Sequence, residues 1–315
     1  MSQFLVTGGA GFIGSNITEY LLARGHYVRV LDNFISGKES NLAFTSGLGP
    51  DKFELIRGDI RDKDVCDQSC MGIDYVLHQA ALRSVPKSLE EPESYNDVNI
   101  NGVMVMLQAA AKHKVKRFVL ASSSAVYGDS DQFPLKESQY PLLMSPYALS
   151  KLAGEYYCRI YAQHFGVSSV CLRYFNVFGP KQALDDEYAV VIPKFIHSIT
   201  HDQQPPVFGD GYQSRDFTFV ENVVSANFLA ATTPGIHHEV VNAAVGEETT
   251  VLSVVELVNK ILGKNIEPQF LDKRAGDIYR TQSDITLIKE KLNYKPLVNF
   301  EEGLKRTVAY FQDKF

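Results

Sequence analysis

The chain has 315 residues, of which 45% are hydrophobic and 22% charged, and its formal net charge at neutral pH is -6. This length can bury a sizeable core, as one large domain or two moderate ones. A negative net charge argues against non-specific binding to nucleic acid. The sequence shows no secretory signal and no apolar run long enough to span a bilayer, so we expect a cytoplasmic protein without a membrane partner.

The four cysteines give little sign of a metal or a disulfide. Cys66 and Cys70 fall at helical spacing, but two thiols without nearby histidines make a poor zinc site. Cys158 and Cys171 add no Cys-x-x-Cys pair. We therefore expect reduced, packed thiols and no metal ion.

The first part of the chain predicts a strand, a glycine loop, a helix to about Arg24 and a second strand over 27–31. The loop, Thr7–Gly14, fits the G-x-G-x-x-G dinucleotide pattern and its G-x-x-G-x-x-G variant. Its glycines permit a tight turn, close approach of the backbone to a pyrophosphate and close packing of the helix on the sheet. Asp32 follows the second strand, where a carboxylate binds a ribose 2′-hydroxyl and repels a 2′-phosphate. The pattern therefore predicts NAD rather than NADP.

The alternation of strand and helix continues with strands over 53–56 and 74–77. Asp59, after the first of these, can contact the adenine or cap the next helix. The second strand runs into His78, which we interpret as a packed histidine in preference to a catalytic acid. The small residues at 80–81 would let a cofactor pass close to the backbone.

A long helix is predicted from Pro92 to about Lys114, followed by a strand over 118–121. This strand delivers the serine run 122–124 to the carboxyl edge of the sheet, where ligands bind in open parallel sheets. A further helix to Phe165 and a strand over 169–172 follow.

Tyr147 and Lys151 lie four residues apart at the start of that further helix, so they share one helical face. An adjacent ammonium favours the phenolate, which makes a base for a sugar hydroxyl near neutral pH, with a serine to orient the oxygen. Tyr310 and Lys314 have the same spacing without upstream serines or a cofactor signature, so the pair alone proves little. The convergence of pair, serines and glycine loop favours chemistry.

In the second half of the chain the alternation stops, and Gly and Pro interrupt short segments. Helical stretches are expected near 222–232, 253–262 and 301–311. We predict an α/β protein with a doubly wound, Rossmann-type parallel sheet in residues 1–175 plus later returning segments. Residues 176–315 would mainly form a smaller, discontinuous lobe over the carboxyl edge.

The sequence leaves the roles of several polar residues in this lobe open. Arg215 and Arg274 can clamp a diphosphate, although a solvated or paired arginine is the ordinary alternative. His237-His238 and the acidic run 185–187 are predicted to be loop residues without a metal-like set of partners.

With these residues in hand, the chain resembles the extended short-chain dehydrogenases/reductases of the nucleotide-sugar epimerase group over essentially its whole length. The motifs that carry the resemblance are Thr7–Gly14, Asp59–Arg61, His78–Ala81, Ser122–Gly128, Tyr147–Lys151, Arg173–Gly179 and Gly209–Asp216. The resemblance implies oxidation at C4 of a UDP-sugar by tightly held NAD, rotation of the 4-ketose and return of the hydride to its other face.

The resemblance also implies roles for single residues. Tyr147 would be the base, Lys151 its electrostatic partner and ribose ligand, and Ser123, four residues before Tyr127, the orienting serine. The implied cofactor-binding residues are Gly8, Gly11, Phe12, Ile13, Gly14, Asp32, Asn33, Ser36, Gly37, Asp59, Ile60, Gln79, Ala80, Ala81, Asn99, Ser122, Tyr147, Lys151 and Tyr174. The implied substrate-binding residues are Arg83, Ser84, Ser123, Ser124, Asn176, Ala189, Val190, Val207, Phe208, Gln213, Arg215, Arg274, Asp277 and Thr281.

Two positions bear on the reaction and the substrate. Similar dehydratases and decarboxylases have an acidic residue two positions after the catalytic serine, where this chain has Ala125, so epimerisation is favoured. Thr281 matches the position facing the sugar C2 substituent, and its small size favours UDP-GlcNAc/UDP-GalNAc, with UDP-glucose/UDP-galactose as a second activity. Ser84-Val85-Pro86 is similar to the UDP-GlcNAc 4-epimerases, but Arg83 stands where those usually have glycine and can instead pair with a uronate carboxylate.

Other readings remain open at this point. UDP-hexuronic acids are alternative substrates, and the chain can also be a net nucleotide-sugar oxidoreductase or a non-catalytic dinucleotide sensor. By analogy, we expect a homodimer formed by the helices over 92–114 and 147–165.

Overall fold

The centre of the molecule is one parallel sheet. A computed structural model of the chain describes residues 1–183, 191–273 and 278–314. Seven strands pair in the order β11-β6-β5-β4-β1-β2-β3, and every pair is parallel. The strands are β1 (Gln3–Thr7), β2 (Tyr27–Asp32), β3 (Phe53–Arg57), β4 (Tyr75–His78), β5 (Arg117–Ser123), β6 (Ser169–Tyr174) and β11 (His238–Ala243). This is the doubly wound α/β fold that the sequence predicts.

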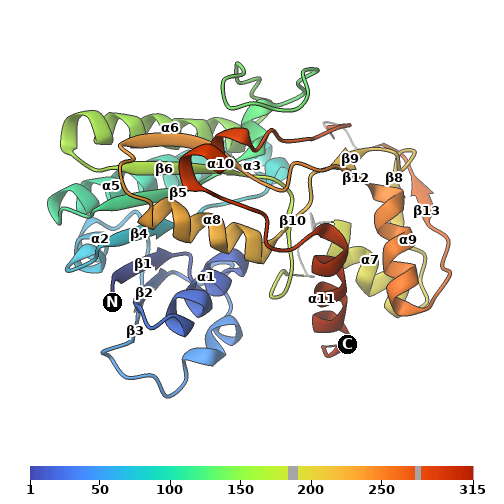
Figure 1. The fold of residues 1–315 in the computed structure, drawn as a ribbon, viewed down its shortest axis with the longest axis horizontal. Helices are drawn as coiled ribbons and strands as arrows, with labels where there is room; N and C mark the ends of the chain where they lie inside the picture. The colour runs from blue at the N-terminus through green and yellow to red at the C-terminus, as the bar shows by residue number, and fades with distance from the viewer. Residues whose placement is uncertain (184–190, 274–277, 315) are drawn as a thin grey trace.

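Helices cover both faces of the sheet (Figure 1). Because side chains alternate along a strand, Phe4 and Val6 of β1 join one apolar cluster while Leu5 joins the other. The first cluster packs under α1 (Phe12–Ala23) and α8 (Val220–Thr232), and the second under α2 (Lys63–Cys70), α5 (Gly102–Lys112) and α6 (Pro146–Phe165). The four cysteines are buried free thiols, as predicted.

The long helix predicted from Pro92 has an irregular start. The structure has α4 (Pro92–Tyr95), a π-helical segment over Asn96–Asn101 and then α5, with helical backbone angles at both joints. A short helix that the sequence analysis did not predict, α3 (Val85–Glu90), precedes α4. None of the described helices is both long enough and apolar enough to cross a bilayer.

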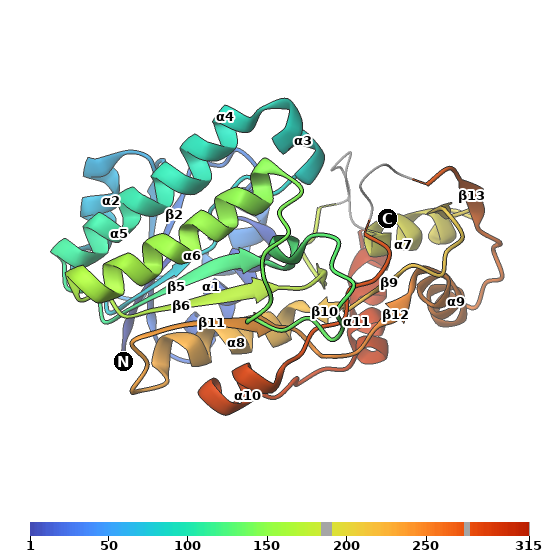
Figure 2. The ribbon, with the colours of Figure 1, turned by 90° about the horizontal axis from the view of Figure 1, so that it is seen from above.

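The lobe lies to one side of the sheet (Figure 2). It contains three pairs of short strands: β7 (Val177–Phe178) with β10 (Thr218–Phe219), β9 (Ser214–Arg215) with β12 (Thr249–Thr250), and β8 (Pro206–Phe208) with β13 (Gln269–Leu271). Its helices are α7 (Val191–Thr200), α9 (Val251–Leu262) and α11 (Phe300–Gln312), whereas α10 (Thr286–Leu292) packs against β11 and α8 beside the sheet.

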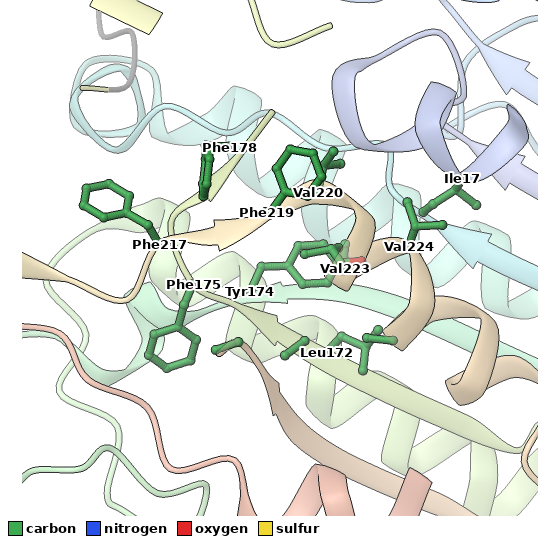
Figure 3. Close-up of a cluster of buried hydrophobic side chains, with 14 of the residues drawn as sticks. Ile17, Leu172, Tyr174, Phe175, Phe178, Phe217, Phe219, Val220, Val223 and Val224 are labelled. Carbon is green, nitrogen blue, oxygen red and sulfur yellow. The ribbon is translucent and has the colours of Figure 1, made fainter. Parts of the chain in front are cut away.

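The apolar core continues from the sheet into the lobe. Tyr174 and Phe175 leave β6, and Phe178, Phe217 and Phe219 extend the same cluster (Figure 3). The ring centroids of Phe178 and Phe219 are 5.6 Å apart. Aromatic packing of this kind fixes the angle at which the lobe stands over the sheet.

One loop prediction is wrong. His238 begins β11, where it pairs with Ser169 of β6. The His238 Nδ1 and the Ser169 hydroxyl are 2.8 Å apart, so the ring is held by the neighbouring strand. The acidic run 185–187 lies outside the described residues.

Candidate active site

The glycine loop joins β1 to α1 as a tight cradle. Gly8 has φ +66°, and a Cβ there would lie 2.8 Å from the Ala80 nitrogen. A Cβ on Gly14 would overlap the Gly8 carbonyl oxygen. Gly11 precedes α1 and donates its N–H to Gly8 O at 3.1 Å, so the loop leads directly into the helix N-terminus. The first N–H groups of a helix lack intrahelical acceptors and favour a phosphate there, so these residues fit a dinucleotide.

Asp32 stands at the carboxyl end of β2, where an NAD ribose is expected. Its Oδ2 accepts from Ala10 N at 2.9 Å and its Oδ1 from Phe34 N at 2.8 Å. The side chain is buried and lines the same cavity as the glycine loop. Two backbone donors therefore fix the carboxylate in position, and its remaining lone pairs can receive a ribose hydroxyl.

Of the two roles left open for Asp59, helix capping is wrong. The N-cap of α2 is Asp62, whose Oδ1 accepts from Asp64 N and Val65 N. Asp59 instead pairs with the Arg61 guanidinium at 2.8 Å and accepts from Asn33 Nδ2 at 2.9 Å. These bonds hold the pKa of the Asp59 carboxyl well below its usual range.

A cavity of about 580 Å³ runs along the carboxyl edge of the sheet. All the expected cofactor-binding residues line it except Gly37, Asp59 and Asn99. Asn99 has a supporting role, because its amide accepts from Leu82 N at 2.8 Å and donates to Leu82 O at 2.9 Å. The expected cofactor-binding residues that line the cavity are Gly8, Gly11, Phe12, Ile13, Gly14, Asp32, Asn33, Ser36, Ile60, Gln79, Ala80, Ala81, Ser122, Tyr147, Lys151 and Tyr174.

Tyr147 and Lys151 reach this cavity from the first turns of α6. Ser145 caps the helix, since its Oγ accepts from Ala148 N at 3.2 Å. Lys151 Nζ donates to Ala121 O at 2.9 Å and lies 5.8 Å from the centroid of the Tyr147 ring. Burial lowers the pKa of Lys151 to about 8, so the ammonium is held in a site that disfavours its charge.

The sequence analysis expected a lowered pKa for Tyr147, and this is wrong for the protein without its ligands. Burial raises the pKa of the phenol, while the neighbouring Ser123 hydroxyl and the positive charge of Arg83 act in the opposite direction. Tyr95, packed edge-on at 6.4 Å between ring centroids, adds to the rise. The Lys151 ammonium donates to Ala121 O instead of to the phenol.

The last two residues of β5, Ser122 and Ser123, have distinct roles. Ser123 Oγ accepts from Ala125 N at 3.2 Å at the start of a short 3-10 helix, Ser124–Tyr127, and its hydroxyl neighbours Tyr147. The Ser122 hydroxyl donates to Glu155 Oε1 at 2.5 Å. Glu155 in turn binds the buried Arg173 guanidinium at 2.8 and 2.9 Å. Ser122 therefore ties the cavity wall to a buried ion pair.

A closed ring of hydrogen bonds holds another part of the wall. Tyr174 Oη donates to Gln79 Oε1 at 2.9 Å, Gln79 Nε2 donates to Asn227 Oδ1 at 3.0 Å, and Asn227 Nδ2 donates to Tyr174 Oη at 2.8 Å. Asn227, on α8, was not predicted. The adjacent His78 packs as a neutral ring 3.0 Å from the Thr7 hydroxyl, and burial lowers its pKa to about 3. This confirms the interpretation of a packed histidine.

The expected substrate residues fall into separate places. Arg83 lines the main cavity. Phe208 and Gln213 line a second hollow of about 150 Å³ in the lobe, where Gln213 Nε2 donates to Phe208 O at 2.6 Å. Ser84 caps α3, and Thr281 is buried with its hydroxyl oxygen 3.4 Å from Asp216 N.

Ser124 begins the 3-10 helix after β5 and is not among the residues that line the main cavity. The other expected substrate residues sit in or beside short strands of the lobe, or cannot be placed. Arg215 donates to Ser214 O at 2.8 Å, Asn176 accepts from Thr218 N at 3.2 Å, and Val207 is buried in β8. Ala189, Val190, Arg274 and Asp277 lie outside the described residues.

Cations that the sequence analysis did not select also line the main cavity. They are Lys38, Lys181 and Lys314, and they join Arg83 and Lys151, whereas Asp32 supplies the one carboxylate among the described lining residues. A positive cavity in a chain of net charge -6 suits an anionic ligand. No group of three or more His, Cys, Asp or Glu side chains suited to a metal occurs among the described residues.

Comparison with known proteins agrees with this geometry. The model of the NAD dependent epimerase/dehydratase family matches residues 4–244. A UDP-glucose 4-epimerase of Mycolicibacterium smegmatis is 35% identical over 312 residues, covering 98% of both chains. Among solved structures, a UDP-N-acetylglucosamine 4-epimerase of Methanobrevibacter ruminantium, in complex with UDP-N-acetylmuramic acid, has a TM-score of 0.95 at 39% identity and covers 100% of this chain and 99% of its own. A UDP-glucuronic acid 4-epimerase of Bacillus cereus, in complex with UDP-glucuronic acid and NAD, has a TM-score of 0.91 at 31% identity, with 99% and 100% covered.

The fold and site are those of an NAD-dependent enzyme built on the short-chain dehydrogenase/reductase plan. The chain belongs to the NAD dependent epimerase/dehydratase family. NAD is its cofactor, and the glycine cradle and the fixed carboxylate of Asp32 fit that group.

Proposed function

We propose that this enzyme is an isomerase that interconverts UDP-GlcNAc and UDP-GalNAc at C4, with UDP-glucose/UDP-galactose as a second activity. The observation that carries the reaction is that Tyr147 and Lys151 line the NAD cavity and that the Ser123 hydroxyl, which is not itself in the lining, neighbours Tyr147. Residues 176–315 would mainly hold the UDP part of the substrate, with Phe208 and Gln213 at the nucleobase.

In the proposed mechanism, Ser123 orients the sugar 4-hydroxyl and Tyr147 takes its proton. NAD, held by the glycine cradle and Asp32, would supply a hydride acceptor and donor for C4. Tyr147 would give the proton back to the 4-oxygen when the hydrogen is restored on the other face of C4. Tyr147 must lose its own proton first, and burial opposes this. Lys151, whose pKa is about 8, is mostly protonated at neutral pH and offsets part of that cost by its charge.

Ala125 supports epimerisation over the dehydratase reaction that the family also contains. Its backbone N–H donates to Ser123 Oγ at 3.2 Å, so position 125 lies next to the orienting serine. An acid there would be able to protonate a leaving group, and a methyl group cannot. The site can therefore move a proton through Tyr147 but has no second acid at this position.

Thr281 supports the N-acetylated substrates. The support is its small size at the position that, by resemblance, faces the C2 substituent. In the structure the side chain is buried, its hydroxyl oxygen is 3.4 Å from Asp216 N, and it lines neither of the two hollows described above. The solved UDP-N-acetylglucosamine 4-epimerase has 39% of its sequence in common with this chain.

Arg83 favours a second candidate function, the 4-epimerisation of UDP-hexuronic acids. It lines the cavity that holds Tyr147, and its charge lowers the pKa of that phenol. A guanidinium at this place can bind a sugar carboxylate through two parallel hydrogen bonds.

The test is incubation of the purified protein with each UDP-sugar separately, without added NAD, followed by NMR of the anomeric protons. Formation of UDP-GalNAc from UDP-GlcNAc supports the proposal. Conversion of a UDP-uronate alone, lost in Arg83→Gln, establishes the second candidate. Accumulation of NADH would indicate a net oxidoreductase, and cofactor binding without any turnover would indicate a sensor.

We also propose a homodimer in which α5 and α6 pair with their symmetry mates. Leu149, Tyr156 and Ile160 of α6 are between 43% and 56% exposed, which leaves an apolar stripe on the outer face of the helix. Light scattering at micromolar concentration should give twice the mass of the chain. A monomeric mass would contradict the proposal.

A further inference from the structure

The last turn of α11 reaches the dinucleotide cavity although the helix belongs to the lobe. Tyr310, Phe311 and Lys314 line the cavity together with the glycine loop. Figures 1 and 2 both show α11 between the sheet and α9. Phe311 is 2% exposed and Val308 is fully buried in the apolar core, so the end of the helix is anchored.

Tyr310 and Lys314 form a defined pair at the cavity wall. Lys314 Nζ donates to Tyr310 Oη at 2.6 Å and lies 4.3 Å from the centroid of its ring. The two residues are one helical turn apart, so both point to the same side of the helix. The pair thus presents an ammonium at a defined place in the lining, and it repeats the spacing of Tyr147 and Lys151, which line the same cavity.

The anionic group that the Lys314 ammonium would contact is expected at the start of α1. The backbone N–H of Lys38 donates to Ala10 O at 3.0 Å, and Lys181 pairs with Glu19 at 2.6 Å, which places both lysines beside the first turns of α1. A helix N-terminus that follows a glycine loop binds the pyrophosphate of a dinucleotide. Asp32, the one described carboxylate of the lining, is engaged by Ala10 N and Phe34 N.

We propose that Lys314 is an NAD-binding residue that contacts the pyrophosphate from the lobe side, with Tyr310 as its positioning residue. The cofactor is then held by both halves of the molecule: by the glycine loop from the sheet and by the end of α11 from the lobe. A dinucleotide leaves such a site only when the two halves separate or the last turn of α11 unwinds. This explains how an enzyme that regenerates its cofactor in every turnover keeps NAD between turnovers.

The test is NAD retention by the holoenzyme, which does not depend on which UDP-sugar is the substrate. We expect Lys314→Gln to raise the Kd for NAD about 5- to 10-fold, because it removes one charge-assisted contact to a phosphate. The ratio of NAD to protein after gel filtration should fall accordingly. The dependence of Kd on salt should become weaker than in the wild type, since one charge no longer contributes.

Three matched variants separate this role from a structural one. Lys305→Gln, on the same helix and paired with Glu301, should leave the Kd for NAD unchanged. Lys314→Arg should retain NAD, and Tyr310→Phe should raise the Kd about 2-fold because the ring remains. If Lys314→Gln binds NAD as tightly as Lys305→Gln, with the same dependence on salt, Lys314 is not a ligand and the proposal fails.

The contact with the pyrophosphate is tested with cofactor fragments. ADP-ribose keeps the pyrophosphate without the nicotinamide, and its affinity should fall by the same factor as that of NAD in Lys314→Gln. The affinity for adenosine, which carries no phosphate, should not change. An equal loss for adenosine would overturn the assignment to the pyrophosphate. Circular dichroism of each variant confirms that the helix content is intact.

Discussion

The parallel sheet and the lobe are stabilised by different kinds of contact. The sheet has continuous buried strands between two apolar clusters, and its ligand residues stand at the strand ends. The lobe has two- and three-residue strand pairs joined by buried polar side chains. Asn222 of α8, for example, holds the segment that leads from the sheet side into α11: it accepts from Leu297 N and Val298 N and donates to Val298 O, at distances between 2.7 and 3.0 Å. The proposed chemistry therefore rests on the strongly patterned half, and the proposed substrate site on the half that depends on single long-range hydrogen bonds.

The largest effect is expected at the catalytic edge of the sheet. Tyr147→Phe removes the proposed base, so we expect kcat to fall by about 10³-fold with NAD still bound. The measurement is turnover of the preferred UDP-sugar together with the NAD content of the protein. Tyr156→Phe, on the exposed face of the same helix, is the control and should keep full activity. If the Tyr147→Phe variant keeps more than a tenth of the wild-type rate, Tyr147 is not the base.

The second-largest effect is expected at Gly14 of α1, and Gly25, which follows that helix, serves as the comparison. Gly14→Ala should lower the free energy of unfolding by about 3 kcal/mol and abolish NAD binding, because the new methyl group overlaps the Gly8 carbonyl. Gly25, at φ +76°, faces open space, so Gly25→Ala should cost only about 1 kcal/mol of backbone strain. Urea unfolding and NAD titration measure both. Equal costs at the two sites would contradict the tight cradle.

Where α8 meets the segment that leads into α11, Asn222→Ala should cost about 2 kcal/mol, because two backbone N–H groups and one carbonyl lose their partner. Asn101→Ala, which removes an exposed bond to Asp97, should cost less than about 0.5 kcal/mol. If the lobe is held as described, KM for the UDP-sugar should rise in Asn222→Ala while NAD stays bound. A fall in NAD content with unchanged KM would contradict the division of roles.

The smallest expected effect is a difference in how pH changes the stability of the two regions. Burial lowers the pKa of His78 in the sheet to about 3, from 6.5, so the unfolded chain binds more protons and stability rises with pH between about 4 and 6. Burial raises the pKa of Asp216 in the lobe to about 6, from 3.8, so the folded chain binds more protons and stability falls over the same interval.

These opposite slopes are tested one at a time. The difference in unfolding free energy between the wild type and His78→Gln should increase from pH 4 to pH 6 by up to about 1 kcal/mol per pH unit. The difference between the wild type and Asp216→Asn should decrease at a similar rate. Thermal or urea unfolding across this range provides the measurement, and slopes of equal sign would be inconsistent with the two burial effects.

The same contrast explains what the sequence predicts and what it does not. The strands, helices and glycine loop of the first half follow from local patterns, and so does the meeting of Tyr147 with Ser123. The strand β11 begins with His238 and Glu239 and contains only two β-branched residues, Val240 and Val241, so its local pattern marks it weakly as part of the sheet. The raised pKa of Tyr147 and the arrival of Lys314 at the cavity depend on tertiary packing, which a spacing of residues does not contain.

The position of β11 has a consequence for how the protein is made. In the complete sheet β6 lies between β5 and β11, and all six of its residues are buried. On the ribosome β6 emerges long before β11, so for that interval its outer side presents unpaired backbone groups and apolar side chains. A fragment that ends at residue 175 would keep that open side permanently and pair with other chains. The NAD-binding sheet therefore gains its last strand late in synthesis, from the far part of the chain.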